Sequence, residues 1–291
     1  MFRSAVYYFY MNDIFKNQQT KIFLDSVDPA ETVQAVELLG SLDGQTTNPS
    51  LIAKSPEIQE FLKTQKFTRD ELFEKYHDIA LHIRETLSTG DISAEVYADA
   101  NSTVDELLEQ AYKIAQWFPG IFIKLPITKA GLATAQQLVS EEISVNMTLC
   151  FSQDQAAAVH AATREAKNAK VFVSPFIGRL DDINLNGADL IKNIQTMYKE
   201  WGSNVGVLGA SIRSVEHINT CSDEGIAAMT IPFKLIKEIH DDTVAAAEVK
   251  TLAPIEYKEL EELPWSEYTI EHELTAKGLE KFAADWNALC E

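Results

Sequence analysis

Eight short runs of apolar or β-branched residues recur along the chain, separated by segments that have the period of a helix. The runs are KIFLD (21–25), GQTTN (44–48), ISAEVYAD (92–99), IFIKLP (121–126), ISVNMTL (143–149), KVFVSP (170–175), VGVLGAS (205–211) and AAMTIP (227–232). Strands that alternate with helices pair in parallel and are covered on both faces, so this order favours a (β/α)8 TIM barrel over an open doubly wound sheet. The second and eighth runs are short, which leaves a count of seven or nine strands open.

The segments between the runs carry helix signals of their own. In residues 71–87 the apolar side chains fall on one helical face: Leu72, Phe73, Tyr76, Ile79, Ala80, Ile83 and Leu87. The boundary signals are the capping-box pairs Thr68–Glu71 and Thr103–Glu106, and Gly90 after the long helix. We also expect a pair of helices after TTNPS and a C-terminal helix over about 271–289, both as additions to the barrel.

No linker, charge block or low-complexity stretch interrupts residues 20–290, so we expect residues 21–291 to form a single barrel domain. Residues 1–20 are predicted to be an N-terminal extension, disordered in its first part, and Met11 is an alternative start. The first residues lack a small-residue cleavage site, and their apolar run is too short to cross a bilayer. A signal peptide and a membrane anchor are therefore not predicted.

Composition excludes several function classes. The chain has 44 acidic and 25 basic residues and a formal charge of −19, which argues against nucleic acid or an anionic membrane as a partner. Three widely spaced cysteines without a CxxC pattern argue for a reducing, cytoplasmic location and against a disulfide frame or zinc site. The six histidines are scattered, and no GxGxxG, P-loop or GxSxG motif is present. We therefore predict neither a metal nor a cofactor.

Lys124 is the residue that fits its surroundings least. It lies within the apolar run IFIKLP, where a charged ammonium group is costly to bury. One explanation is that the long side chain reaches water past its apolar neighbours. The other is chemical, because burial favours a neutral amine, which can attack a carbonyl. The run by itself favours the first explanation.

Polar residues fall late in most of the predicted strands. Alternation along a strand places Phe23 with Asp25, Ser93 with Glu95, Phe122 with Lys124, Asn146 with Thr148, Phe172 with Ser174, and Ser211 with Arg213. Taken alone, each would be read as a cap, a turn residue or a solvated surface group. In a barrel, however, these strand ends meet at one mouth, where active sites of this fold lie. We expect the following residues to converge there: Asp25, Asn48, Glu95, Lys124, Asn146, Thr148, Ser174 and Ser211.

Eight motifs in order along the chain resemble those of the transaldolase family. They are FLDS, QTTNPSL, ISAEVYAD, IFIKLPIT, VNMTLCFS, VSPFIGRLDD, VLGASIRS and AMTIPFKLIKE, and they cover nearly the whole chain from Lys21. The resemblance implies a (β/α)8 barrel with a Schiff-base lysine on the fourth strand. It also implies transfer of a dihydroxyacetone unit from sedoheptulose 7-phosphate or fructose 6-phosphate to glyceraldehyde 3-phosphate or erythrose 4-phosphate, in the non-oxidative pentose phosphate pathway.

The resemblance also implies a role for each matching residue. Lys124 would form the imine, Asp25 would act as acid and base at the C4 hydroxyl, and Glu95 with Thr148 would move protons during imine formation. The residues implied to bind the sugar are Thr47, Asn48, Asn146, Ser174 and Phe176. The residues implied to bind the phosphate are Arg179, Ser211 and Arg213.

Two features bear on the choice between transfer and simple cleavage. The stretch KLPIT around Lys124 resembles the smaller fructose 6-phosphate aldolases of the same superfamily. Phe176 and the tail HELTAKGLEKFAADW instead resemble transaldolases, since the aldolases have tyrosine in place of this phenylalanine. We predict a transaldolase, with an aldolase as the alternative and a non-catalytic sugar-phosphate binder as a second one. The resemblance suggests a homodimer or a larger homo-oligomer, and the sequence does not decide between them.

Overall fold

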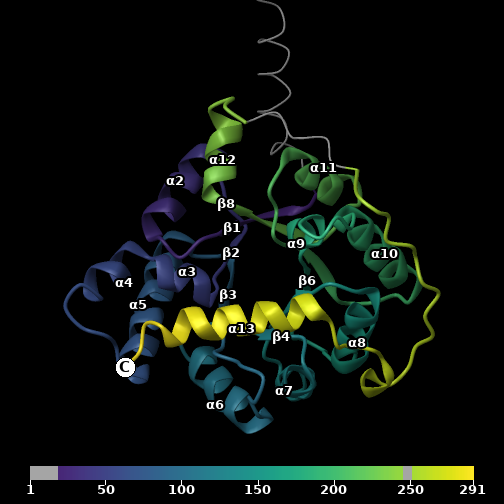
Figure 1. The fold of residues 1–291 in the computed structure, drawn as a ribbon, viewed down its shortest axis with the longest axis horizontal. Coiled ribbons are helices and arrows are strands. Elements are labelled where there is room, and N and C mark those ends of the chain that lie inside the picture. Colours follow the sequence, from purple (N-terminus) through teal and green to yellow (C-terminus); the bar gives the residue numbers. More distant parts are fainter. Residues whose placement is uncertain (1–18, 245–250) are drawn as a thin grey trace, which may run out of the picture.

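The computed structural model describes residues 19–244 and 251–291 (Figure 1). The predicted N-terminal extension, with Met11 as an alternative start, lies outside the described residues except for Gln19 and Thr20. None of the helices in the described ranges is long and apolar enough to cross a membrane.

Eight parallel strands form a closed barrel in the order of the sequence, which confirms the predicted (β/α)8 fold. The strands are β1 (Lys21–Asp25), β2 (Gly44–Thr46), β3 (Asp91–Glu95), β4 (Phe122–Pro126), β5 (Val145–Cys150), β6 (Val171–Pro175), β7 (Gly206–Gly209) and β8 (Ala228–Pro232). Three predicted strands extend too far: β2 ends before Thr47, β3 before Val96, and β7 before Ala210. The chain turns at these points to begin the loops of the barrel mouth. Ser211, predicted at the end of a strand, instead has a left-handed backbone with φ 56°.

Helices surround the strands on all sides (Figure 1). They are α2 (Pro29–Leu39), α3 (Pro49–Lys54), α4 (Pro56–Phe61), α5 (Arg69–Thr86), α6 (Val104–Ala115), α7 (Lys129–Ser140), α8 (Gln153–Thr163), α9 (Ile177–Asp181), α10 (Gly187–Glu200), α11 (Val215–Asp223), α12 (Phe233–His240), the 3-10 turn η1 (Trp265–Glu267) and α13 (Glu273–Asn287). The predicted helix pair is α3 and α4, and the predicted C-terminal helix is α13. Both predicted capping boxes are present, at the starts of α5 and α6. Helix α5 is capped by Leu87, so Gly90 does not end it.

The part of the barrel interior that lies away from the mouth is apolar. Phe23, Phe122, Phe172, Leu208 and Ala228 form a separate buried cluster there. The ring of Phe172 stacks on Phe122 at 5.1 Å and meets Phe23 edge-on at 5.9 Å. Asp25, Lys124 and Ser174 lie two residues further along these strands, so they point into the barrel above this aromatic floor. The floor separates the polar mouth from the other end of the barrel.

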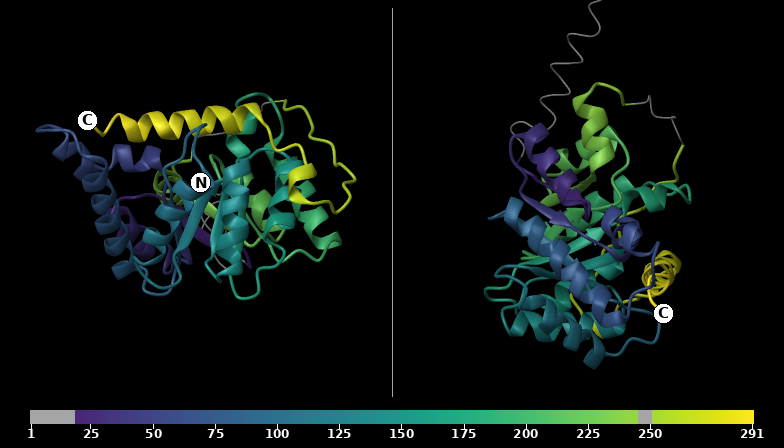
Figure 2. Two further views of the ribbon diagram at one scale, coloured as in Figure 1. Left: turned by 90° about the horizontal axis from the view of Figure 1, so that it is seen from below. Right: turned by 90° about the vertical axis from the view of Figure 1, so that its left-hand side faces the viewer.

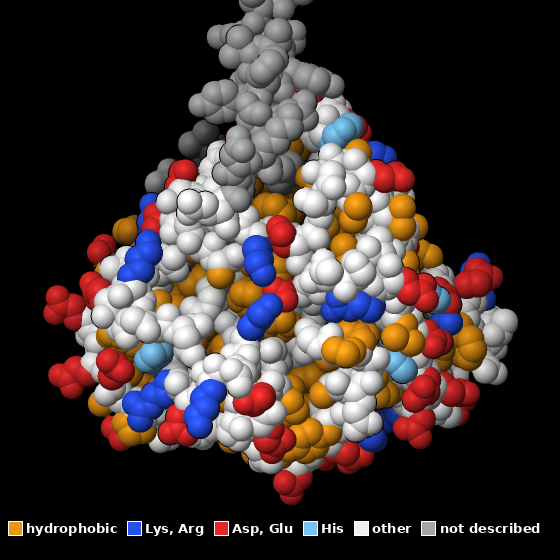
Figure 3. Space-filling view, turned by 180° about the vertical axis from the view of Figure 1, so that it is seen from behind, with side chains coloured by type: hydrophobic (Ala, Val, Ile, Leu, Met, Phe, Trp, Pro, Cys, Tyr) orange, Lys and Arg blue, Asp and Glu red, His pale blue; other side chains and the backbone are white. Residues whose placement is uncertain are grey.

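The other end of the barrel is closed by charged side chains. Asp91 accepts from Lys21 at 2.9 Å and from Lys170 at 3.0 Å. The face seen from behind shows basic and acidic side chains side by side near its centre (Figure 3). These ion pairs are partly exposed, so we expect each to contribute little to the free energy of unfolding.

Helix α13 crosses the barrel mouth (Figures 1 and 2). Thr275 Oγ1 donates to the carbonyl of Leu149 at 2.9 Å, which fixes the start of the helix beside β5. Ser50 Oγ donates to Asp285, which joins the other half of the helix to α3. The C-terminal helix is therefore held at both ends over the residues that follow the strands.

Candidate active site

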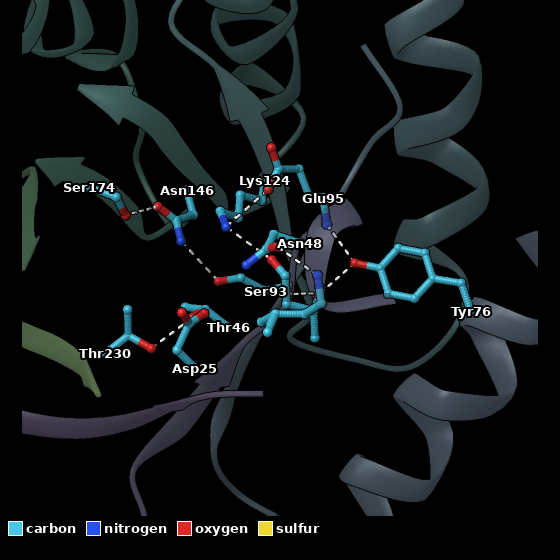
Figure 4. Close-up of polar contacts among 12 residues, drawn as sticks. Asp25, Thr46, Asn48, Tyr76, Ser93, Glu95, Lys124, Asn146, Ser174 and Thr230 are labelled. Atoms are coloured by element: carbon cyan, nitrogen blue, oxygen red, sulfur yellow. Dashed lines mark hydrogen bonds and ion pairs between the residues drawn. The ribbon is translucent and has the colours of Figure 1, made fainter. Parts of the chain in front are cut away.

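Lys124 is buried within the barrel mouth. The exposed fraction of the whole residue is 4%, and Nζ donates to the carbonyl of Thr47 at 2.9 Å. Nζ also lies 3.0 Å from Oε2 of Glu95 (Figure 4). The side chain therefore does not extend to bulk water, as the first explanation for this lysine required.

Glu95 is held at the end of β3 by a residue that the sequence reasoning missed. The backbone N–H of Glu95 donates to the hydroxyl of Tyr76, on α5, at 2.8 Å. Thr47 Oγ1 donates to the carbonyl of Ser93 at 2.8 Å, so its hydrogen bond with Tyr76 must be donated by the tyrosine. Tyr76 thus joins the ends of β2 and β3 from outside the barrel. The helical period identified its burial but not the partners of its hydroxyl.

Burial changes the acidity of the two carboxylic acids. Burial raises the pKa of Glu95, and the positive charge of Lys124 partly offsets this. Burial likewise raises the pKa of Asp25. The positive charges of Lys124 and Arg179 and a hydrogen bond from Thr46 partly offset this rise. Thr46 Oγ1 donates to Oδ1 of Asp25 at 3.0 Å. Both acids therefore hold a proton more readily than a surface carboxylate does.

Neutral polar groups complete the wall of the site. Ser174 Oγ donates to Asn146 Oδ1 at 2.6 Å, and Asn146 Nδ2 donates to Ser93 Oγ at 3.2 Å (Figure 4). Thr148 Oγ1 is buried without a hydrogen-bond partner among the described residues. A buried hydroxyl of this kind is a candidate to bind a ligand or water.

These groups surround a cavity of about 240 Å³ at the barrel mouth. The predicted residues that line it are Asp25, Asn48, Lys124, Thr148, Ser174, Phe176, Arg179, Ser211 and Arg213. Three predicted residues lie behind the lining, where they contact it: Thr47, Glu95 and Asn146. Further lining residues were not predicted: Thr46, Ser50, Leu51, Lys54, Ala210, Thr230, Lys281 and Phe282. Lys281 and Phe282 come from α13, and a sequence alone does not show which strand ends a distant helix will cover.

The sequence model of one protein family, described as Transaldolase/Fructose-6-phosphate aldolase, matches residues 22–291. The chain belongs to this family. A "Probable transaldolase" of Cereibacter sphaeroides is 35% identical over 91% of this chain and 95% of its own length. Proteins with the same name from Dehalococcoides mccartyi and Herpetosiphon aurantiacus are 32% and 34% identical, over 92% and 91% of this chain and 99% and 94% of their own lengths. The chain is thus an enzyme of the transaldolase type, which excludes the non-catalytic binder that the sequence had left open.

Besides Lys124, the basic side chains that line the cavity of this transaldolase-type enzyme are partly or fully exposed. Arg213 forms an ion pair with Asp182, whereas Arg179 makes no hydrogen bond or ion pair with any residue in the described ranges. Arg179 follows β6 in the short helix α9, and its guanidinium lies 5.0 Å from the ring centre of Phe176. Lys54 and Lys281 also line the cavity. Lys281 pairs with Asp285 at 3.1 Å. Four basic side chains besides Lys124 therefore line the cavity although the whole chain is acidic.

The arrangement suits carbonyl chemistry. Residues 19–244 and 251–291 contain no group of three or more His, Cys, Asp or Glu side chains that could hold a metal ion. They do bring together a buried amine, two carboxyl groups of raised pKa and an unpaired hydroxyl. An amine in such surroundings can act as a nucleophile, with neighbouring acids to move the protons.

Proposed function

We propose that this transaldolase-type enzyme transfers a dihydroxyacetone unit through a Schiff base on Lys124. The donor would be fructose 6-phosphate or sedoheptulose 7-phosphate, and the acceptor glyceraldehyde 3-phosphate or erythrose 4-phosphate, as in the non-oxidative pentose phosphate pathway. The observation that carries the proposal is the burial of Lys124 at the cavity wall, with Glu95 3.0 Å from its nitrogen.

The first half-reaction begins with attack of the neutral amine on the C2 carbonyl. Glu95 is placed to take a proton from the nitrogen, since its raised pKa favours the protonated acid. Loss of the C2 oxygen as water then gives a protonated imine. Thr148 has an unpaired hydroxyl that would hold the departing water near Lys124.

Asp25 would take the proton of the C4 hydroxyl. The C3–C4 bond then breaks, its electron pair moves into the imine, and the aldose phosphate leaves. The three-carbon fragment remains on Lys124 as an enamine. In the second half-reaction its C3 attacks the acceptor aldehyde, and Asp25 returns the proton to the new C4 oxygen. Hydrolysis of the imine releases the product ketose and restores the amine.

Substrate binding in this proposal follows the polarity of the cavity. Asn48 and Ser174 face the cavity beside Lys124 and would bind the sugar hydroxyls, with Asn146 orienting Ser174. Arg179, Ser211 and Arg213 line the same cavity, are more exposed than Lys124 and would bind the phosphate, because guanidinium groups match its geometry.

Cleavage without transfer is the second candidate, because the family's description includes fructose-6-phosphate aldolase. Phe176 favours transfer. Its ring lines the cavity and carries no acidic proton, so it cannot protonate the enamine before an acceptor arrives. The names of the relatives, probable transaldolases, also favour transfer.

Two measurements test the proposal. Borohydride reduction with fructose 6-phosphate, followed by peptide mass spectrometry, should find a reduced sugar adduct on Lys124. A coupled assay should find glyceraldehyde 3-phosphate release that depends on erythrose 4-phosphate. Lack of an adduct would exclude the imine, whereas equal release without acceptor would identify an aldolase.

A further inference from the structure

Two residues of helix α13, Phe282 and Gly278, lie against the side chain of Arg179. The guanidinium carbon lies 5.4 Å from the ring centre of Phe282, a distance typical of a cation–π contact. Phe282 is 4% exposed, and it lines the cavity. One turn earlier, a Cβ added at Gly278 would lie 2.8 Å from Nη1 of Arg179 and 2.7 Å from Cδ2 of Leu149. The same face of α13 thus provides an aromatic contact and the space that the guanidinium occupies.

Nothing else in the described residues fixes Arg179 by polar contacts. It has no ion pair or hydrogen bond there, and its second cation–π contact is the ring of Phe176 at 5.0 Å. The charges of Glu95, Asp182 and Asp25 act on it without a hydrogen bond. Aromatic rings hold a guanidinium without using its N–H donors. The five donors therefore stay free for an anion. Arg213 differs, because it is paired with Asp182.

We propose that Phe282 is a positioning residue, which holds Arg179 in the orientation that binds the phosphate of the sugar substrates. This inference rests on the proposed function, since it takes Arg179 to be a phosphate ligand. The C-terminal helix then does more than cover the barrel. It fixes the preference of the site for phosphorylated over unphosphorylated aldehydes. Phe282 contacts the guanidinium of Arg179, and Gly278 leaves the space that this group occupies.

The test compares two acceptors, erythrose 4-phosphate and D-erythrose, with saturating fructose 6-phosphate as the donor. In Phe282→Leu the ratio of kcat/KM for the phosphorylated acceptor to that for D-erythrose should fall roughly 3- to 30-fold, the range that loss of a cation–π contact represents. The fall should appear in KM for erythrose 4-phosphate, with a smaller change in kcat/KM for D-erythrose. Phe282→Tyr keeps the aromatic face and should restore the ratio. Gly278→Ala should lower it, because the added methyl group displaces Arg179.

Leu279→Ala is the matched control on the same helix. Leu279 is also buried, but it lines a different cavity beside Ile127. Its truncation should lower the thermal stability as much as Phe282→Leu does without changing the acceptor ratio. If Leu279→Ala changes the ratio equally, the effect belongs to general packing of α13, and the inference is wrong.

A double-mutant cycle separates this inference from the function on which it rests. In an Arg179→Gln background, which removes the cation, Phe282→Leu should cause no further fall in the acceptor ratio. An equal further fall would overturn the positioning role. If wild type and Arg179→Gln share one ratio, Arg179 does not recognise the phosphate, and the positioning role fails with that assignment, whereas the transfer reaction is tested separately by the adduct on Lys124. If Arg179→Gln lowers the ratio and Phe282→Leu does not, only the positioning role fails.

Discussion

Nζ of Lys124 lies 3.0 Å from Oε2 of Glu95, and the exposed fractions of the two side chains are 6% and 3%. Taking two charged groups out of water costs more than an ordinary ion pair returns, so stability alone does not explain this pair. Although the oxygen is within ion-pair distance, it has no aligned hydrogen bond. The geometry suits a carboxyl group that exchanges a proton with the nitrogen.

Replacing the carboxyl group should slow imine formation without preventing it. In Glu95→Gln the group that takes the amine proton is lost while the shape of the side chain is kept. We expect the single-turnover rate of adduct formation with fructose 6-phosphate to fall about 10²- to 10⁴-fold, the usual contribution of one acid–base group. Rapid quenching with borohydride measures this rate. Glu109→Gln is the control, since Glu109 pairs with Lys113 on the surface at 2.8 Å, and its rate should match wild type. Equal rates in all three proteins would exclude the role of Glu95.

Removing the hydroxyl of Tyr76 should lower kcat, although Tyr76 does not line the cavity. Tyr76→Phe leaves the buried N–H of Glu95 without its acceptor and Thr47 without its donor. The free energy of unfolding should fall by about 1–3 kcal/mol, measured by denaturant titration. Because Thr47 accepts from Lys124 and Glu95 faces it, kcat should fall as well.

Tyr198→Phe provides the comparison for Tyr76. Tyr198 is also buried, and its hydroxyl donates to the carbonyl of Ala156 at 2.7 Å, on the outer helices. This variant should lose similar stability and keep the kcat of wild type. If both variants keep kcat, Tyr76 supports the fold and not the site.

The sequence predicts the barrel well because its signals are local. Each strand is an apolar run, and each capping box spans four residues, so both can be read without knowledge of distant contacts. The convergence of the polar residues could also be predicted, because each lies at the end of a recognisable strand and a closed barrel brings these ends together. The prediction of Ser211 at a strand end is wrong because serine gives no local signal for a left-handed backbone, which glycine, asparagine and aspartate favour.

The missed residues depend on long-range packing. Phe282 lies about a hundred residues after Arg179, and its pattern on α13 is that of any buried helix residue. The helical period predicts that Tyr76 is buried, but it does not predict that the hydroxyl bonds to Thr47 and Glu95 at the ends of β2 and β3. Such contacts follow from the way a helix is placed on the barrel, which periodicity does not specify.

The side chain at position 176 should control the fate of the enamine. Phe176→Tyr places an ionisable hydroxyl in the cavity lining, where it can protonate the enamine before an acceptor binds. We expect the rate of dihydroxyacetone release from fructose 6-phosphate without acceptor to rise, on the order of tenfold or more. Measuring this release and the transfer to erythrose 4-phosphate in the same preparation gives their ratio. An unchanged ratio would mean that position 176 does not decide between transfer and cleavage.

Asp25 should reduce stability at neutral pH in return for its catalytic role. Burial raises the pKa of Asp25 in the folded state above its ordinary value of 3.8, so the folded protein holds this proton more tightly than the unfolded chain does. Stability therefore falls as the pH rises from about 3.8 through the folded-state pKa, and the loss is complete above it. Asp25→Asn removes this penalty. At pH 8 we expect the variant to be more stable than wild type by about 0.5–2 kcal/mol and to lack transfer activity.

The pH dependence of that difference is the decisive measurement, because a neutral amide has no proton to lose. Denaturant titrations at pH 8, 6 and 4 should show the advantage of Asp25→Asn shrinking as the pH falls, since the wild-type carboxyl group becomes protonated and neutral. Asp105→Asn, on the exposed start of α6, makes the same change of charge at the surface, and its stability should stay within about 0.5 kcal/mol of wild type. If Asp25→Asn is more stable than wild type by the same amount at all three pH values, the buried negative charge of Asp25 is not the cause of the difference.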